Sequence, residues 1–137
     1  MKARGYDTNL AAEFFVLSTL HRLGLAATLT LGNRKSVDIV VVRDAGDALT
    51  IDVKGLAGKT GWPVDNVKDM REGHFLVFVC YLDRIADPTT QPDVFVVPSA
   101  SLDPLVYHAP GGRRVIPLSK MREKGAKFRD AWHLLKG

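Results

Sequence analysis

Residues 36–55 read SVDIVVVRDAGDALTIDVKG, in which two segments rich in β-branched residues flank a run of turn-forming residues. The segments 37–43 and 49–54 are typical of strands, and DAGD at 44–47 favours a tight connection between them. The pattern therefore predicts a β-hairpin. The rest of the chain is expected to pack around it.

Charged side chains fall on one face of the second predicted strand. Because side chains alternate along a strand, Asp52 and Lys54 share one face and Val53 takes the other. A hairpin loop of three or five residues would put Asp38 opposite Asp52, with Cβ atoms about 5 Å apart, whereas a loop of four would put it opposite Val53. Carboxylates directly across a ladder repel by about 0.2–1 kcal/mol, so the first register needs a cation. Hard oxygen ligands at this spacing suit Mg²⁺.

The pattern of Asp38 followed by Asp52-Val53-Lys54 resembles the catalytic core of the PD-(D/E)XK phosphodiesterase superfamily, which includes many restriction endonucleases and Holliday-junction resolvases. Val37 stands where the motif name has Pro. The resemblance implies that Asp38 and Asp52 bind Mg²⁺ or Mn²⁺, with the Val53 carbonyl as a third ligand. It also implies that Lys54 orients or activates the attacking water. The alternative is a surface hairpin with solvated charges.

A helix is expected before the hairpin, beginning at Asp7 or Thr8 and ending near Leu23, with Gly24 as its stop signal. Its apolar stripe is predicted to consist of Leu10, Phe14, Leu17 and Leu20. Glu13 falls inside that stripe, so its carboxylate needs a cation, a hydrogen-bond donor or a water-filled site. The resemblance implies that Glu13 joins the metal site. Alternatively, Glu13 reaches solvent or pairs with an Arg.

The remaining pattern completes an α/β chain. Residues 55–66 are Gly-rich and irregular, and are expected to form a substrate-side loop in which Trp62 either stacks on a base or anchors the packing. Further strands are predicted at 25–31, 75–82, 93–98 and 113–118, a short helix at 66–72, and a helix from residue 126. The continuous apolar run at 75–82 should lie inside the sheet. This order matches a restriction-endonuclease-like mixed β-sheet flanked by helices: helix, three-strand meander, helix or loop, strand, strand, helix.

Composition limits the class of protein. The 137 residues predict a single nuclease-like domain over 1–137. The lone cysteine, Cys80, lies in an apolar run and excludes a disulfide within one chain, which favours a reducing compartment. The polar N-terminal residues do not resemble a secretory signal, and the longest apolar run is too short to cross a bilayer. A cytoplasmic protein without a membrane partner is expected.

Positive charge is concentrated at one end of the chain. The net charge is +4, but residues 113–137 hold eight Lys and Arg against Glu123 and Asp130. This basic C-terminal segment favours a polyanionic partner, although a solvated helix face gives the same pattern. The residues predicted to contact nucleic acid are Arg34, Lys35, Lys59, Lys124, Lys127 and Arg129.

The predicted function is a metal-dependent nuclease that hydrolyses phosphodiester bonds of nucleic acid, with DNA as the expected partner and Mg²⁺ or Mn²⁺ as cofactor. Its catalytic residues would be Glu13, Asp38, Asp52 and Lys54. Enzymes that cut both strands of a duplex often use two copies of such a site, which is consistent with a homodimer. The alternative is a catalytically inactive module on the same fold that binds nucleic acid or protein. A third alternative is an interaction protein whose charges only cover its surface.

Overall fold

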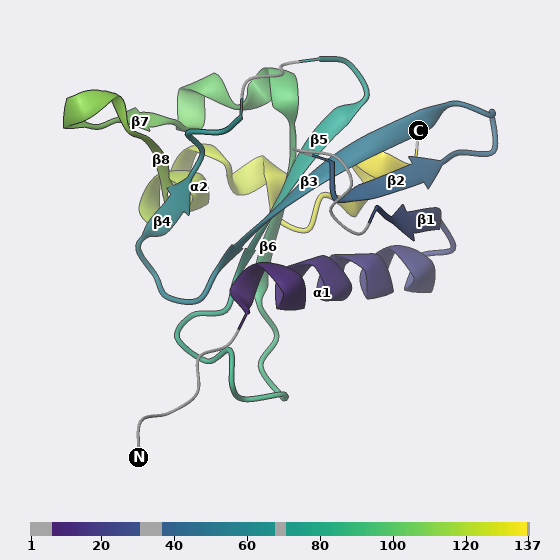
Figure 1. Ribbon diagram of the computed structural model, residues 1–137, viewed down its shortest axis with the longest axis horizontal. Helices are drawn as coiled ribbons and strands as arrows, with labels where there is room; N and C mark the ends of the chain where they lie inside the picture. Colours follow the sequence, from purple (N-terminus) through teal and green to yellow (C-terminus); the bar gives the residue numbers. More distant parts are fainter. Residues whose placement is uncertain (1–6, 31–36, 68–70, 137) are drawn as a thin grey trace.

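A computed structural model describes residues 7–30, 37–67 and 71–136. Figure 1 shows a central sheet with α1 (Thr8–Arg22) along one face. The sheet contains five strands, β1 (Ala26–Leu29), β2 (Ile39–Val42), β3 (Ala48–Leu56), β5 (His74–Cys80) and β6 (Asp93–Pro98). A second sheet contains β4 (Gly61–Pro63), β7 (Tyr107–His108) and β8 (Arg114–Pro117), and is followed by α2 (Leu118–Lys124). Short 3₁₀ turns occur at Ser99–Ser101, Asp103–Leu105, Pro110–Gly112, Ala126–Phe128 and Trp132–Leu135.

The five-stranded sheet is mixed, in the order β1-β2-β3-β5-β6. Strands β3 and β5 are parallel, and the other neighbouring pairs are antiparallel. The predicted fold class, a mixed sheet flanked by helices, is confirmed. Strand β5 lies between β3 and β6 and is buried along almost its whole length, as its continuous apolar sequence predicts.

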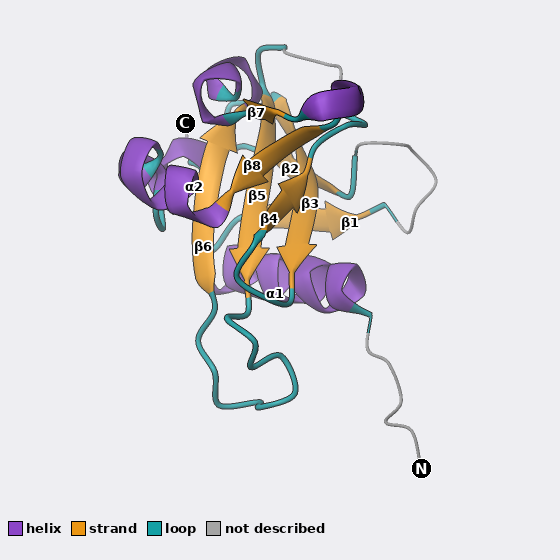
Figure 2. Cartoon of the chain, turned by 90° about the vertical axis from the view of Figure 1, so that its left-hand side faces the viewer, coloured by secondary structure: helices purple, strands orange, loops and turns teal. Residues whose placement is uncertain are grey.

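The two faces of the sheet carry separate apolar cores. On one face, α1 packs through Val16 and Leu20 against the β3 residues Ile51 and Val53. On the other face, the small sheet and α2 lie over β5 and β6 (Figure 2), where Leu76, Phe78 and Phe95 are buried. Trp62 of β4 is fully buried there, and its ring centroid lies 5.2 Å from that of Phe78. Trp62 is therefore a packing anchor, and base stacking by this side chain is excluded.

The predicted apolar stripe of α1 is wrong at two positions. Leu10 and Phe14 are exposed, and the fully buried residues of the helix are Ala12, Val16 and Leu20. The reason is close packing on β3. A Cβ at Gly55 would lie 2.9 Å from the Thr8 carbonyl oxygen and 3.2 Å from the Ala12 Cβ, so the small side of the helix faces the sheet.

The predicted C-terminal helix from residue 126 is also wrong. Two 3₁₀ turns replace it because Asp130 adopts a left-handed conformation (φ 48°) and Arg129 forms a β-bridge with Phe95 of β6. The helix of this region lies earlier, at Leu118–Lys124, and ends at Gly125.

The predicted helix at 66–72 includes residues 68–70, which lie outside the described part of the chain, and its described residues are not helical. No helix within 7–30, 37–67 or 71–136 has the length and apolar character needed to cross a membrane.

Candidate active site

The candidate site lies at the edge of β3, where β2 ends. Strand β2 pairs with β3 from Val42–Ala48 to Ile39–Ile51, which is the register of a five-residue loop. Pairing stops there, because the chain bends at Asp38. The Asp38 backbone N–H still donates to the Ile51 carbonyl (2.8 Å), which keeps this residue against β3.

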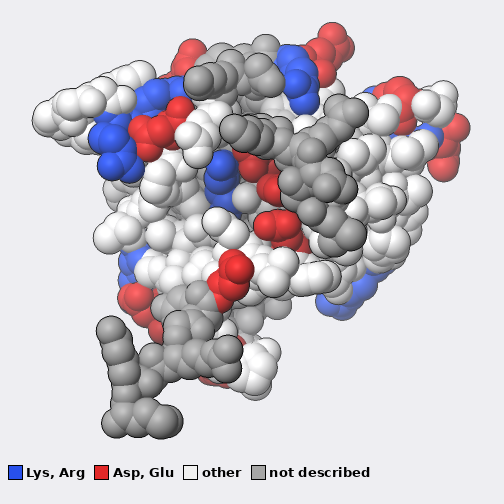
Figure 3. All heavy atoms as spheres, viewed as in Figure 1, with Lys and Arg blue, Asp and Glu red and all other residues white. Residues whose placement is uncertain are grey.

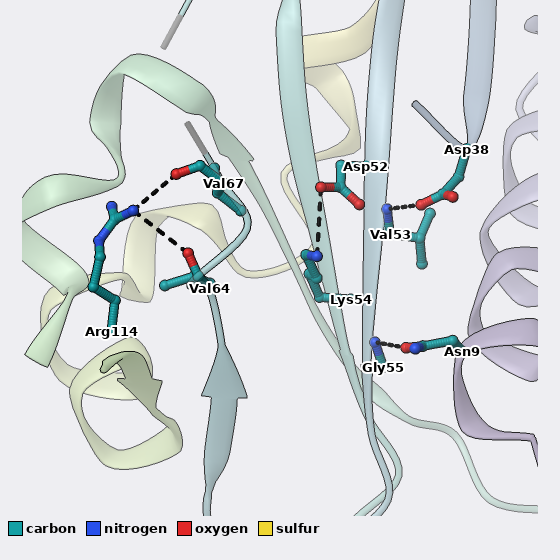
Figure 4. Close-up of polar contacts among 9 residues, drawn as sticks. All are labelled: Asn9, Asp38, Asp52, Val53, Lys54, Gly55, Val64, Val67 and Arg114. Carbon is teal, nitrogen blue, oxygen red and sulfur yellow. Dashed lines mark hydrogen bonds and ion pairs between the residues drawn. The ribbon is translucent and has the colours of Figure 1, made fainter. Parts of the chain in front are cut away.

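Side chains cover the edge of β3 beyond the paired region. The Val53 N–H donates to Asp38 Oδ2 at 2.7 Å, and the Gly55 N–H donates to Asn9 Oδ1 at 3.1 Å (Figure 4). Asn9 therefore ties the first turn of α1 to the residue that follows Lys54. No sequence pattern predicts this role, since a polar residue in a first helical turn is usually solvated.

Asp52 and Lys54 project from the same side of β3, as their spacing predicts, whereas Asp38 approaches the edge of the strand from the side of α1 (Figure 4). Asp52 is only 4% exposed, and its Oδ2 accepts no hydrogen bond from any described residue. The Lys54 Nζ lies 3.6 Å from that oxygen, an ion-pair distance. A buried carboxylate oxygen without a donor is unfavourable unless a cation or ordered water completes its surroundings.

The carboxylates influence one another electrostatically. Burial raises the pKa of Asp52 to about 6; Lys54 opposes the rise and the negative charge of Asp38 adds to it. The pKa of Glu13 is also raised, first by burial and then by the charge of Asp38. Asp38 is therefore close enough for its charge to raise the pKa of both Asp52 on the sheet and Glu13 on α1. Figure 3 shows acidic and basic side chains gathered near the middle of this face.

A divalent metal fits part of this arrangement. Within the described residues, no group of three or more His, Cys, Asp or Glu side chains is placed to hold a metal ion. Mg²⁺, however, commonly binds proteins through one or two carboxylates and keeps water in its other positions. Asp38 and Asp52 supply that number, and Asp52 Oδ2, which accepts no hydrogen bond from a described residue, is an oxygen that a metal ion would satisfy.

A polar row continues from Asp52 along the same face of β3. Thr50 lies two residues earlier, and its Oγ1 is 2.7 Å from Nδ1 of the buried His74 on β5. Arg71 Nη2 also reaches Thr50 Oγ1, at 3.4 Å. These residues were not predicted, because a single His at the start of an apolar strand carries no recognisable motif.

The residues predicted to contact nucleic acid are scattered. Arg34 and Lys35 lie outside the described residues, and Lys59, Lys124 and Lys127 are exposed. Arg129 is exposed but binds Asp93, with its Nη2 2.6 Å from Oδ1. Other guanidinium groups of the basic C-terminal segment are also engaged: Arg122 with Asp93, Arg113 with Asp65, and Arg114 with the Val64 and Val67 carbonyls (Figure 4). The free positive charge of this segment is smaller than its composition indicates.

The class that the fold defines is mixed α/β, with a mixed β-sheet flanked by helices. The solved structure of a bacterial homing endonuclease, I-Ssp6803I, superimposes with a TM-score of 0.54 and 21% sequence identity, over 93% of this chain and 88% of that chain. At this identity the similarity shows a shared fold. No protein-family model matches the sequence, and no curated protein matches it.

Contact between α1 and β3 should limit substitutions at Gly55. Because its Cβ would press on the Thr8 carbonyl and on Ala12, Gly55→Ala is expected to destabilise the protein by about 1–3 kcal/mol. Gly58→Ala is the control, since the nearest atom to its Cβ would be the Asp83 Oδ1 side-chain atom at 3.3 Å. Urea unfolding measures both. Equal stabilities of the two variants would contradict the close contact.

The raised pKa of Asp52 predicts a pH-dependent stability difference. The folded protein holds this proton up to about pH 6, whereas the unfolded chain releases it near the ordinary value of 3.8. The contribution of Asp52 to the free energy of unfolding should therefore fall as pH rises from about 4 to about 6. Asp52→Asn should lack this fall. Urea unfolding of both metal-free proteins between about pH 4 and pH 6 isolates the contribution of Asp52. If the free energies of unfolding of the two proteins changed in parallel with pH, the prediction would be contradicted.

Proposed function

We propose that the protein is a metal-dependent nuclease that hydrolyses phosphodiester bonds of nucleic acid, with DNA as its substrate and a site of the PD-(D/E)XK type. The observation that carries the proposal is the buried Asp52 carboxylate. Its Oδ2 accepts no hydrogen bond from a described residue, lies at ion-pair distance from Lys54, and is close enough to Asp38 for the charge of Asp38 to raise the pKa of Asp52. The fold shared with a homing endonuclease supports the same class of activity.

Asp38 and Asp52 would hold Mg²⁺ or Mn²⁺, with the Val53 carbonyl as a further ligand. The metal, when bound, lowers the pKa of a coordinated water and offsets charge on the phosphate in the transition state. One oxygen of Asp38 is fixed by the Val53 N–H, which orients the carboxylate and leaves its other oxygen for the metal. Asp38 is thereby held at the edge of β3 before substrate arrives.

Lys54 and Glu13 would act beside the metal ligands. The Lys54 ammonium lies next to the Asp52 carboxylate, where its N–H groups can hold and orient a water that attacks phosphorus. Glu13 extends from α1, and its pKa is raised first by burial and then by the negative charge of Asp38. Its carboxylate would accept a hydrogen bond from a water of the same site.

The substrate would be held by the exposed basic residues. Lys59 lies in the loop that follows Lys54, and we assign Lys124 and Lys127 to phosphate contacts as well. Arg34, Lys35 and Arg129 complete the proposed set. A homodimer would supply one site for each strand of a duplex.

The test is cleavage of supercoiled plasmid and of branched DNA, with Mn²⁺ or Mg²⁺ and with chelator. A nuclease nicks one of these substrates only when metal is present. An inactive binding module on this fold would bind DNA equally with and without chelator and leave both substrates intact.

Salt dependence tests the basic C-terminal segment. If Lys124 and Lys127 each neutralise one phosphate, replacing both with Ala should reduce the slope of log affinity against log salt by about two units. Arg129 is left in place because its loss would remove a partner of Asp93. Fluorescence anisotropy with labelled duplex measures the slope. Lys136→Ala is the control, because Lys136 is also exposed. An unchanged slope in the double variant would show that DNA contacts the protein at other residues.

A further inference from the structure

The outward face of α1 carries almost no charge. Over its 15 residues the helix contains only Glu13 and Arg22 as Asp, Glu, Lys or Arg, and Glu13 is half-buried and approaches Asp38. Leu10 is 44% exposed and Phe14 is 52% exposed. A helix that faces water normally presents charged and polar residues on that side. This face instead has the composition of a surface that another element covers.

Most of the exposed residues of α1 form one stripe along the helix. Leu10 and Phe14 are four residues apart, so their side chains are neighbours on the surface. Ala11 and Ser18, which are small, are exposed on either side of Phe14. Small residues next to apolar ones allow a second helix to approach closely.

Opposite charges lie at the two ends of this stripe. Asp7, the N-cap residue, is exposed seven positions before Phe14, and Arg22 is exposed eight positions after it. If two copies of α1 pack antiparallel with Phe14 at the centre, each Asp7 faces the last turn of the other helix, where Arg22 lies. The helix dipoles also oppose each other favourably in this arrangement. The surface is thus complementary to itself, as a two-fold interface requires.

We propose that the α1 stripe, formed by Asp7, Leu10, Ala11, Phe14, Ser18 and Arg22, is a homodimer interface in which two copies of α1 pack antiparallel. The occupant is a second copy of this chain because nucleic acid would require positive charge along the stripe, whereas Arg22 is its one Lys or Arg. The charges of the ends match those of a reversed copy. This inference does not depend on nuclease activity, and its failure would leave the metal and cleavage tests unaffected.

The oligomeric state of the full chain tests the interface. Sedimentation equilibrium over a wide concentration range should show a reversible monomer–dimer equilibrium for the parent protein. Phe14→Asp should weaken the dimer by about 30-fold or more, because it places a charge at the centre of the contact. Tyr107→Asp is the matched control: Tyr107 is also 52% exposed but lies on β7, and this variant should dimerise like the parent.

The charged ends are tested separately. Asp7→Asn keeps a good N-cap residue and removes the charge, so it should weaken the dimer without loss of thermal stability. Arg22→Glu should weaken it further, and high salt should reduce the difference between each variant and the parent. A parent that stays monomeric at every concentration would overturn the proposal. A dimer that Phe14→Asp does not weaken would overturn it as well.

Discussion

Asp52→Asn is expected to abolish metal-dependent cleavage while leaving the metal-free protein at least as stable as the parent. Loss of a metal ligand removes several kcal/mol of transition-state stabilisation, so the cleavage rate should fall by roughly a thousandfold or more. Without metal, the Asp52 carboxylate is buried, lacks a hydrogen bond at Oδ2 and is repelled by Asp38. Asn has nearly the same shape and no charge, so stability should hold or rise by up to about 1 kcal/mol.

Thermal melts with and without Mn²⁺ measure both effects. Mn²⁺ should raise the melting temperature of the parent, since a ligand that binds the native state stabilises it, and should do little for Asp52→Asn. Asp44→Asn is the control, because Asp44 is exposed in the turn of the same hairpin. Asp52 would have an ordinary structural role if metal-free Asp52→Asn were less stable than the parent and if Mn²⁺ did not change the melting temperature of the parent.

The sequence predicted the elements whose signals are local. The bounds of α1 follow from Asp7, which accepts a hydrogen bond from the Leu10 N–H, and from Gly24, which has a positive φ of 80°. The strands β3, β5 and β6 follow from runs of β-branched and aromatic residues. Each of these features is decided by residues that are neighbours in the sequence.

Tertiary contacts determine the two features of the fold that were predicted wrongly, the buried side of α1 and the structure after residue 126. Periodicity alone predicts that the side of α1 with Leu10 and Phe14 is buried. Because α1 lies close to Gly55 of β3, the side with the small residue Ala12 is buried instead. Similarly, the apolar spacing after residue 126 is helical, yet the bridge between Arg129 and β6 prevents a continuous helix. Contacts between distant segments override local spacing in both cases.

The candidate site was predictable only in part for the same reason. The spacing of Asp52 and Lys54 fixes their common face, because alternation along a strand is a local property. The position of Asp38 depended on the hairpin loop, and the bend that directs its carboxylate to the Val53 N–H could not be read from the register. Asn9 reaches Gly55 across 46 positions of sequence.

Lys54→Ala should separate the group that orients water from the groups that hold metal. Lys54 lowers the pKa of Asp52 through its positive charge, so its removal should raise that pKa above about 6. Asp52 would then hold its proton to higher pH, and the acid limb of the pH–rate profile should move to higher pH. Loss of the oriented water should lower the maximal rate by about 10²–10⁴-fold.

Metal binding should survive Lys54→Ala at alkaline pH, where Asp52 is ionised even without its positive neighbour. Mn²⁺ should therefore still raise the melting temperature of this variant at pH 8, in contrast to Asp52→Asn. Stability without metal should not rise, because the buried carboxylate loses the cation 3.6 Å away. Lys136→Ala, which removes an exposed Lys away from the site, should match the parent in rate and in pH profile. Normal cleavage by Lys54→Ala would remove Lys54 from the mechanism, whereas loss of Mn²⁺ stabilisation at pH 8 would make it part of the metal site.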